Sequence, residues 1–281
     1  MREDIKIRFN TLLKEGRSLA GIIEECYEMY KENNGTLSRD EFKKELLLAM
    51  EIDEYSYYTE NVDKKLKDYV EKSVYPKYEK NDKAHGIVHI REVVRRAFEL
   101  NESLGLNLNH NMIYAIASCH DLGKYIDHKT HEKIAAETFM ADEGMKDFFS
   151  NTERVIIHDA IEDHRSSKED TPRSTYGKLI SSADRNTTIE MVFIRSFFVG
   201  QERTPEYTVE EFLDFTHKRL SKRYGEENPE NMFYNDKTYD LFLSDMRALL
   251  SDEKAFKDRY CKVNGIESRT GLLIDEKGYS M

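Results

Sequence analysis

The chain has 281 residues, of which 35% are charged, while only 4 are proline and 13 are glycine. This composition argues against a loop-rich or all-β protein, and the formal net charge of −11 disfavours nonspecific binding to nucleic acid or to anionic membranes. Three widely separated cysteines (Cys26, Cys119 and Cys261) form no CxxC pair, so neither a disulfide framework nor a structural zinc site is expected.

The N-terminal stretch, MREDIKIRFN, is charged and lacks the apolar segment of a signal peptide. The chain also lacks a run of about 20 apolar residues, the length that a membrane-spanning helix needs. We therefore expect a cytoplasmic protein that contacts neither membrane nor nucleic acid.

Apolar residues at helical spacing dominate the chain, and no convincing alternating strand pattern occurs. In the N-terminal region, residues 1–74, this spacing predicts helices over 1–15 and 19–31. Ser38 and Glu41 form the pattern of a capping box, which predicts a further helix start there. A charged helix over 60–80 is expected to break near Pro76. The expected fold class is all-α.

The region from 82 to 197 has a different character, because eight of the nine histidines lie in it. Five segments there are predicted to be helices: 82–100 (with His85 and His89 one turn apart), 110–121, 129–140, 152–165 and 174–198, a single long helix that carries Asp184. The second segment ends in ASCHDLGK, where His120 and Asp121 follow small and apolar residues and Gly123 is expected to terminate the helix.

Helical geometry separates the histidines into two groups. His89, His131 and His164 each share a face with apolar residues, so they are predicted to point inward. His158 lies six residues before His164, about 240° away around the helix, so these two are not expected to face one site. Four histidines are interpreted as ordinary hydrogen-bonded or capping residues: His85, His110, His158 and His217.

The tail from residue 201 to 281 is charged and rich in Tyr and Phe, with helices expected around 208–223 and 236–260 and a loop at YGEENPEN. These helices are expected to pack on the core as a C-terminal extension, where they could form a lid, a specificity wall or the surface of a homodimer. For the final segment, RTGLLIDEKGYSM, the sequence is compatible with either an ordered extension or a disordered terminus.

Inward histidines that alternate with aspartates on separate helices are typical of a metal site, because imidazole and carboxylate ligate first-row transition metals and a helix bundle can bring them together. From spacing alone, a metal site and a set of ordinary hydrogen-bonded core histidines are equally well supported.

The order His89, His120–Asp121, Asp184 resembles the HD superfamily of metal-dependent phosphohydrolases. Three sequence segments are similar to motifs of this superfamily: DKAHGIVHIREVVRRA to its first helix, IASCHDLGK to its His–Asp motif, and LISSADR to the helix that carries its last aspartate. The resemblance covers roughly residues 75–200 and implies an HD helical bundle between additional N- and C-terminal helices.

The resemblance implies that His89, His120, Asp121 and Asp184 hold one metal. The two-metal members of the superfamily have two additional histidines that hold a second metal. The resemblance implies that His131 and His164 occupy those positions here and that Asp121 bridges the two metals. His128 and His158 are alternatives to His131. One or two divalent ions of Fe, Mn, Ni, Co or Zn suit such ligands.

The implied reaction is hydrolysis of a phosphate ester of a nucleotide or related small molecule by metal-activated water. Asp121 and Lys124 are the candidate catalytic residues, and His85, Lys124, His128 and Arg185 are candidate substrate contacts. For Lys124 an ordinary exposed lysine is the alternative, and for Arg185 an ion pair with a carboxylate is the alternative. Two other functions stay open for the whole domain: an HD-type di-iron oxygenase, and a noncatalytic sensor of nucleotide or metal.

Overall fold

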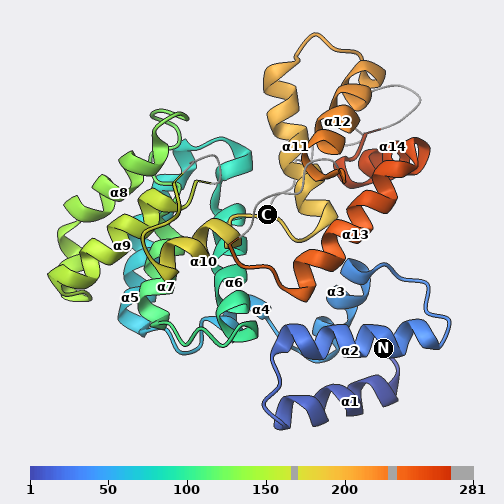
Figure 1. The fold of residues 1–281 in the computed structure, drawn as a ribbon, viewed down its shortest axis with the longest axis horizontal. Helices are drawn as coiled ribbons and strands as arrows, with labels where there is room; N and C mark the ends of the chain where they lie inside the picture. The colour runs from blue at the N-terminus through green and yellow to red at the C-terminus, as the bar shows by residue number, and fades with distance from the viewer. Residues whose placement is uncertain (166–169, 227–232, 267–281) are drawn as a thin grey trace.

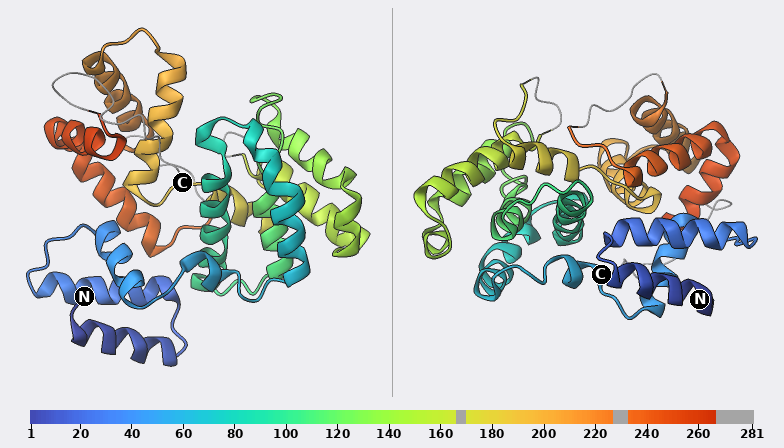
Figure 2. Two further views of the ribbon diagram at one scale, coloured as in Figure 1. Left: turned by 180° about the vertical axis from the view of Figure 1, so that it is seen from behind. Right: turned by 60° about the horizontal axis from the view of Figure 1, so that its bottom comes forward.

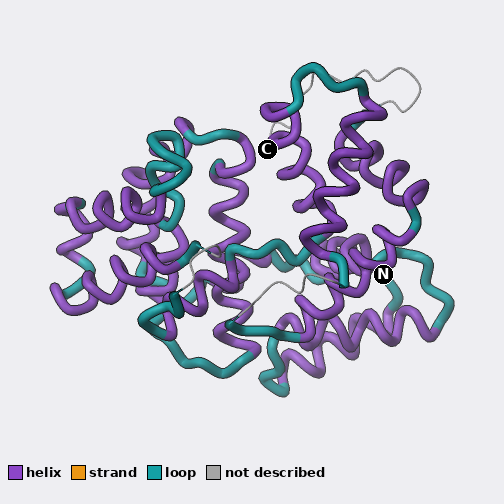
Figure 3. Tube along the Cα trace, turned by 45° about the horizontal axis from the view of Figure 1, so that its top comes forward, coloured by secondary structure: helices purple, strands orange, loops and turns teal. Residues whose placement is uncertain are grey.

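The structure is a computed structural model that describes residues 1–165, 170–226 and 233–266. Every regular element in these ranges is a helix and none is a strand (Figures 1 and 3). The predicted all-α fold is therefore confirmed. Within the same ranges, no helix combines the length and the apolar character needed to cross a bilayer. The segment RTGLLIDEKGYSM lies outside the described residues, as does most of the YGEENPEN loop.

The N-terminal helices form the first of three groups, and they pack through an apolar face. They are α1 (Glu3–Lys14), α2 (Leu19–Glu32), α3 (Arg39–Ala49) and α4 (Glu54–Tyr58). The predicted capping box is present, because the Ser38 side chain accepts from the Glu41 backbone and the Glu41 carboxylate accepts from the Ser38 backbone. The buried side chains of α1 and α2, among them Phe9 and Ile22, join the main hydrophobic core.

The central group is the helical bundle that carries the histidines. It consists of α5 (Lys64–Tyr69), α6 (Ile87–Ser103), α7 (His110–Cys119), α8 (His131–Ala141), α9 (Asn151–Asp163) and α10 (Thr175–Ala183). Its core is continuous with that of the N-terminal helices. In Figures 1 and 2 it lies to one side of the molecule, with the other two groups beside it.

The C-terminal helices form the third group and have a core of their own. They are α11 (Ile189–Arg203), α12 (Val209–Tyr224), α13 (Lys237–Ser251) and α14 (Glu253–Asn264). Aromatic side chains such as Phe193, Phe256 and Tyr260 form this second core. The expected boundary at residue 200 falls inside α11, whereas this packing places the whole of α11 with the C-terminal group.

Three predicted helices are divided in the structure. The segment 60–80 changes at Val70 into a π-helical turn (Val70–Val74) and then a 3₁₀ segment (Tyr75–Lys80) that contains Pro76. The prediction of one long helix over 174–198 is wrong, because α10 ends at Ala183 and the Thr188 side chain caps a new helix, α11. The segment 236–260 is likewise two helices, because Asp252 ends α13 and caps α14.

The predicted pairing of His85 and His89 on one helix is also wrong. His85 ends a short 3₁₀ turn, Lys83–His85, and Gly86 is the N-cap of α6. His85 does not cap the start of α6, because no side chain makes the cap hydrogen bond there. Instead Asp82 accepts a hydrogen bond from the backbone of Ala84 and lies 2.8 Å from His85 Nδ1, which fixes the imidazole at the entrance of the bundle.

Candidate metal centre

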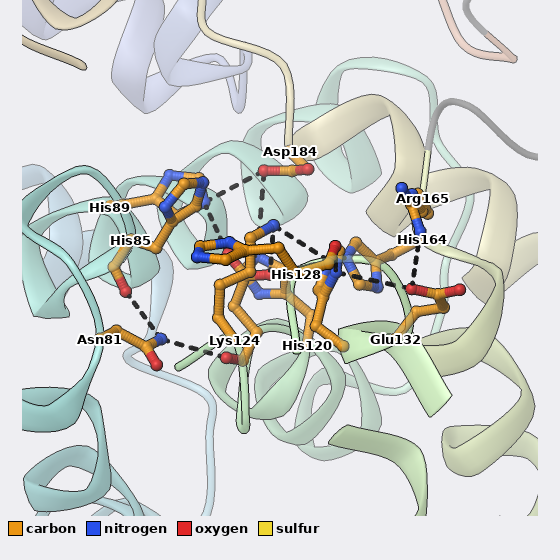
Figure 4. Close-up of polar contacts among 12 residues, drawn as sticks. Asn81, His85, His89, His120, Lys124, His128, Glu132, His164, Arg165 and Asp184 are labelled. Carbon is orange, nitrogen blue, oxygen red and sulfur yellow. Dashed lines mark hydrogen bonds and ion pairs between the residues drawn. The ribbon is translucent and has the colours of Figure 1, made fainter. Parts of the chain in front are cut away.

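The His–Asp motif sits where a buried helix ends. The Asn109 side chain caps the start of α7, and small residues such as Ala115 and Ala117 let neighbouring helices pack closely against it. The helix stops at Cys119, so that His120 and Asp121 leave it at the centre of the bundle, each no more than 2% exposed. The Asn81 side chain donates to the backbone carbonyl of Asp121 and holds this turn in place (Figure 4).

Gly123 does not terminate the helix as predicted, because α7 already ends at Cys119; it lies in the turn that follows, with a φ of +89°. A Cβ at this position would lie 2.4 Å from Ile134 Cγ2 on α8. Gly123→Ala is therefore expected to lower the free energy of unfolding by about 2–4 kcal/mol, from backbone strain and overpacking together. Gly105→Ala is the matched control, because Gly105 also has a positive φ but open space around it. Urea unfolding of both variants measures the difference, and equal losses would contradict the contact with Ile134.

Four ligand atoms lie close together: His89 Nε2, His120 Nε2, Asp184 Oδ1 and Asp121 Oδ2. Figure 4 labels His89, His120 and Asp184. His89 Nε2 and His120 Nε2 each lie 3.6 Å from Asp121 Oδ2. Asp184 Oδ1 lies 3.1 Å from His89 Nε2 and 3.9 Å from His120 Nε2. Two ligands about 2.1 Å from one ion are separated by about 3.0–3.6 Å at ordinary coordination angles. These side chains, from α6, the end of α7 and the end of α10, are therefore spaced to share a cation.

A second group of ligand atoms meets the other oxygen of the same carboxylate. Asp121 Oδ1 lies 3.3 Å from His131 Nε2 and 3.7 Å from His164 Nε2, and these two nitrogens are 3.2 Å apart. His131 begins α8 and His164 follows α9, and both rings are buried as their helical faces predict. Each oxygen of Asp121 thus faces its own pair of imidazoles.

The hydrogen bonds of three rings direct their Nε2 lone pairs into the centre. His120 Nδ1 lies 2.8 Å from the carbonyl oxygen of Ala117, His164 Nδ1 lies 2.6 Å from that of Ile161, and His131 Nδ1 lies 3.1 Å from that of His128. A carbonyl can only accept, so each Nδ1 must carry the proton and each Nε2 is left as an acceptor. This is the tautomer that binds a metal through Nε2, with the backbone orienting the ring.

Three buried atoms of the centre have no hydrogen-bond partner within the described ranges: His89 Nε2, His120 Nε2 and Asp184 Oδ1. Buried polar atoms are nearly always satisfied, so such a convergence calls for a group that binds all three. A cation fits it, because the donor set is two imidazole lone pairs and a carboxylate oxygen. The residues present therefore fit a divalent metal.

The protonation states are those that metal binding requires. Burial lowers the pKa of His131 and of His164 to about 4 despite the opposing charge of Asp121, and burial also lowers that of His120. Burial opposes ionisation of Asp121, but the surrounding imidazoles and Lys124 outweigh it and hold its pKa well below the usual range. At neutral pH the centre therefore offers the neutral imidazoles of His120, His131 and His164 beside the ionised Asp121, as metal ligation needs.

The remaining candidate residues divide between the centre and other places. Lys124 is partly buried, with Nζ 3.7 Å from Asp121 Oδ1 and 3.1 Å from His131 Nε2, so it is not an ordinary exposed lysine. His85 and His128 lie next to the centre, with ring centroids 6.5 Å apart. Arg185 lines a small cavity beside His89 and Glu92.

The other histidines lie away from the metal centre. His158 is on the outer side of α9 beside Asp159 and Glu137. His110 packs its ring on Phe98, and His217 Nε2 lies 2.9 Å from the carbonyl oxygen of Leu250. The two alternatives to His131, His128 and His158, are thus not among the side chains that surround Asp121 Oδ1. His128 contributes only its backbone carbonyl, which lies beside His131 Nδ1.

A cavity of about 490 Å³ opens from the centre toward the C-terminal helices. His85, Lys124, His128, His131, His164 and Asp184 line its near side. Its other walls carry arginines that the sequence analysis did not single out: Arg165, Arg195, Arg203, Arg219 and Arg223. The helical spacing of the four arginines on α11 and α12 was visible in the sequence, but nothing in it showed that these helices turn those faces toward the histidines.

Comparison with known families matches residues 86–188 to the HD domain. The match runs from the N-cap of α6 to the N-cap of α11 and contains all six predicted ligands. No curated protein and no solved structure matches the chain. The buried His and Asp clusters could bind metal, as HD domains do. The helical fold, the clustered side chains and the family match together show that residues 86–188 of this chain are an HD domain.

Proposed function

We propose that the protein is a metal-dependent phosphohydrolase that cleaves a phosphate ester of a nucleotide or related small molecule. The observation that carries this proposal is Asp121, whose two carboxylate oxygens each face a separate pair of imidazoles. Such a carboxylate suits two bridged cations. His89, His120 and Asp184 would complete one position, and His131 and His164 the other.

A pair of divalent transition metals, from Fe, Mn, Ni, Co or Zn, would lower the pKa of a bound water and neutralise phosphoryl oxygens. In the reaction, a water oxygen bonds to phosphorus, the P–O bond to the leaving group breaks, and the leaving oxygen takes up a proton. Lys124 lies near Asp121 and lines the cavity, so in this proposal it would donate to a phosphoryl or leaving oxygen. His85 is held by Asp82 and, with His128, lines the path that the substrate would take.

The test is metal removal and reconstitution. The chain is stripped with a chelator, reloaded with one metal at a time, and assayed for phosphate release from p-nitrophenyl phosphate and a panel of nucleotides and sugar phosphates. We expect release only from the metal-loaded protein, because the proposed nucleophile is a water that the metals would activate. The apoprotein should also unfold at a lower temperature, since metal binds only the folded centre.

Full metal loading without phosphate release from any member of the panel would contradict the proposal. Oxygen uptake by the iron-loaded protein in the presence of polyols would instead identify an oxygenase.

A further inference from the structure

The cavity beside the metal centre has a charge opposite to that of the whole chain. The chain carries a net charge of −11, yet Asp184 is the only carboxylate among the described residues that line the cavity, beside one lysine and five arginines. Most of these cations come from α11 and α12, outside the HD domain. Only a cation close to the metal centre can contact a phosphoryl group that is held there.

Arg195 is the cation of α11 that lies close to the centre. Its helix packs against the 3₁₀ turn that ends at His85, and Val192 and Val199 line the cavity with it at spacings of three and four residues. Burial opposes ionisation of Asp184, but the neighbouring imidazoles and Arg195 hold its pKa below the usual range. Burial and the charge of Arg195 also lower the pKa of His85, against the effect of its carboxylate partner. The half-buried guanidinium therefore acts on groups at the metal centre.

Arg195 is also available to a ligand. In the part of the chain that the structure describes, its guanidinium forms neither a hydrogen bond nor a close ion pair. Arg165, by contrast, is already paired with Glu132. The charge that acts on Arg195 is that of Asp184, a predicted metal ligand. With a cation at the centre this negative charge is shared, so the guanidinium and the metal repel each other unless an anion lies between them.

We propose that Arg195 binds a non-bridging oxygen of the phosphoryl group that reacts at the metal centre, and that the substrate class is a terminal phosphoryl group, as in a phosphomonoester. A terminal group has three non-bridging oxygens, enough for both metal positions and the guanidinium. A phosphodiester has only two. Guanidinium suits this task because its planar fork donates two hydrogen bonds to phosphate oxygens. The inference rests on the proposed function for the reaction, but the contact can be tested by binding alone.

The metal-loaded full chain is titrated calorimetrically with inorganic phosphate and with dimethyl phosphate. The titrations are done at pH 8, where phosphate is mostly a dianion, and at fixed low ionic strength because salt screens such contacts. We expect phosphate to bind at least about tenfold more tightly than dimethyl phosphate. Arg195→Ala should weaken phosphate binding by at least about tenfold, the loss of a charge-assisted hydrogen bond, and leave dimethyl phosphate within about twofold. Arg195→Lys should lose less, because it keeps the charge without the fork.

Arg203→Ala is the matched control. It removes the same charge from the same helix and cavity, eight residues and about 12 Å further along the axis. Its affinity for phosphate should stay within about threefold of the wild type. Metal affinity is measured beside it, without phosphate, and should not fall in Arg195→Ala, because a cation near Asp184 is removed. Phosphate should raise the metal affinity of the wild type more than that of Arg195→Ala, because the two binding equilibria are linked.

An Arg195→Ala variant that binds phosphate like the wild type would overturn the assignment, as would an equal loss in Arg203→Ala. Loss of metal from Arg195→Ala without phosphate would also overturn it, because the residue would then act through the metal ligands. Faster hydrolysis of bis(p-nitrophenyl) phosphate than of p-nitrophenyl phosphate would refute the substrate class and keep the proposed hydrolysis. If phosphate binding depends on Arg195 but no ester is hydrolysed, the contact stands and the proposed hydrolysis falls.

Discussion

Replacement of Asp121 by alanine is expected to remove both metal ions and to lower phosphate release by at least about 10³-fold. The two oxygens of Asp121 face the two groups of imidazoles: Oδ2 lies 3.6 Å from His89 and His120, and Oδ1 lies 3.3 Å from His131. A bound metal provides several kcal/mol of transition-state stabilisation, and each 1.4 kcal/mol corresponds to a factor of ten in rate.

The measurement is elemental analysis of the purified variants beside their activity. The wild type should carry about two ions per chain, and His164→Ala should retain one, because its ring belongs only to the second group. His158→Ala is the matched control: it lies on the same helix, α9, but on the outer side, so metal content and rate should not change. Full metal content in Asp121→Ala would show that this carboxylate does not bridge the two positions.

Arg96→Ala is expected to lower the free energy of unfolding by about 3–5 kcal/mol, the loss typical of a broken buried ion pair. Arg96 on α6 is 1% exposed, and its guanidinium forms two hydrogen bonds, of 2.8 and 2.6 Å, to the Asp236 carboxylate at the start of α13. It also lies 3.2 Å from Glu99 Oε1. Truncation leaves two buried carboxylates without this partner and weakens the link between the HD domain and the C-terminal helices.

Lys237→Ala provides the comparison, because Lys237 is the neighbour of Asp236 but pairs with Glu28 on the exposed surface. Surface pairs of this kind contribute about 0–1 kcal/mol, so this variant should unfold close to the wild type in urea. A double-mutant cycle between Arg96→Ala and Asp236→Ala should return a coupling of at least about 1 kcal/mol. A coupling near zero would assign the loss to the packing of the Arg96 side chain alone.

Much of the helical architecture was predictable from local signals. Apolar spacing predicted most helices, and the capping box at Ser38 and Glu41 is present as expected. The inward faces of His89, His131 and His164 followed from helical periodicity, and all three are buried. These features depend on residues three or four apart, so the sequence alone contains them.

The breaks between helices were harder to predict. The segment through Asp184 has apolar residues at helical spacing on both sides, yet it divides at Arg185–Thr188, where Thr188 caps α11. That break lets α10 pack in the HD domain and α11 in the C-terminal core. Neither packing preference is visible in the segment itself, because each depends on partners far away in the chain.

By itself, the sequence determined the all-α class, the inward histidines and the resemblance to the HD superfamily, since each is expressed in local spacing or in the order of motifs. The tertiary structure alone decided that the two oxygens of Asp121 face different imidazole pairs, that Arg185 lines a separate cavity, and that arginines of α11 and α12 line the cavity beside the metal centre. The physical reason is that periodicity defines which side of a helix is buried, whereas contacts between distant segments define what that side meets.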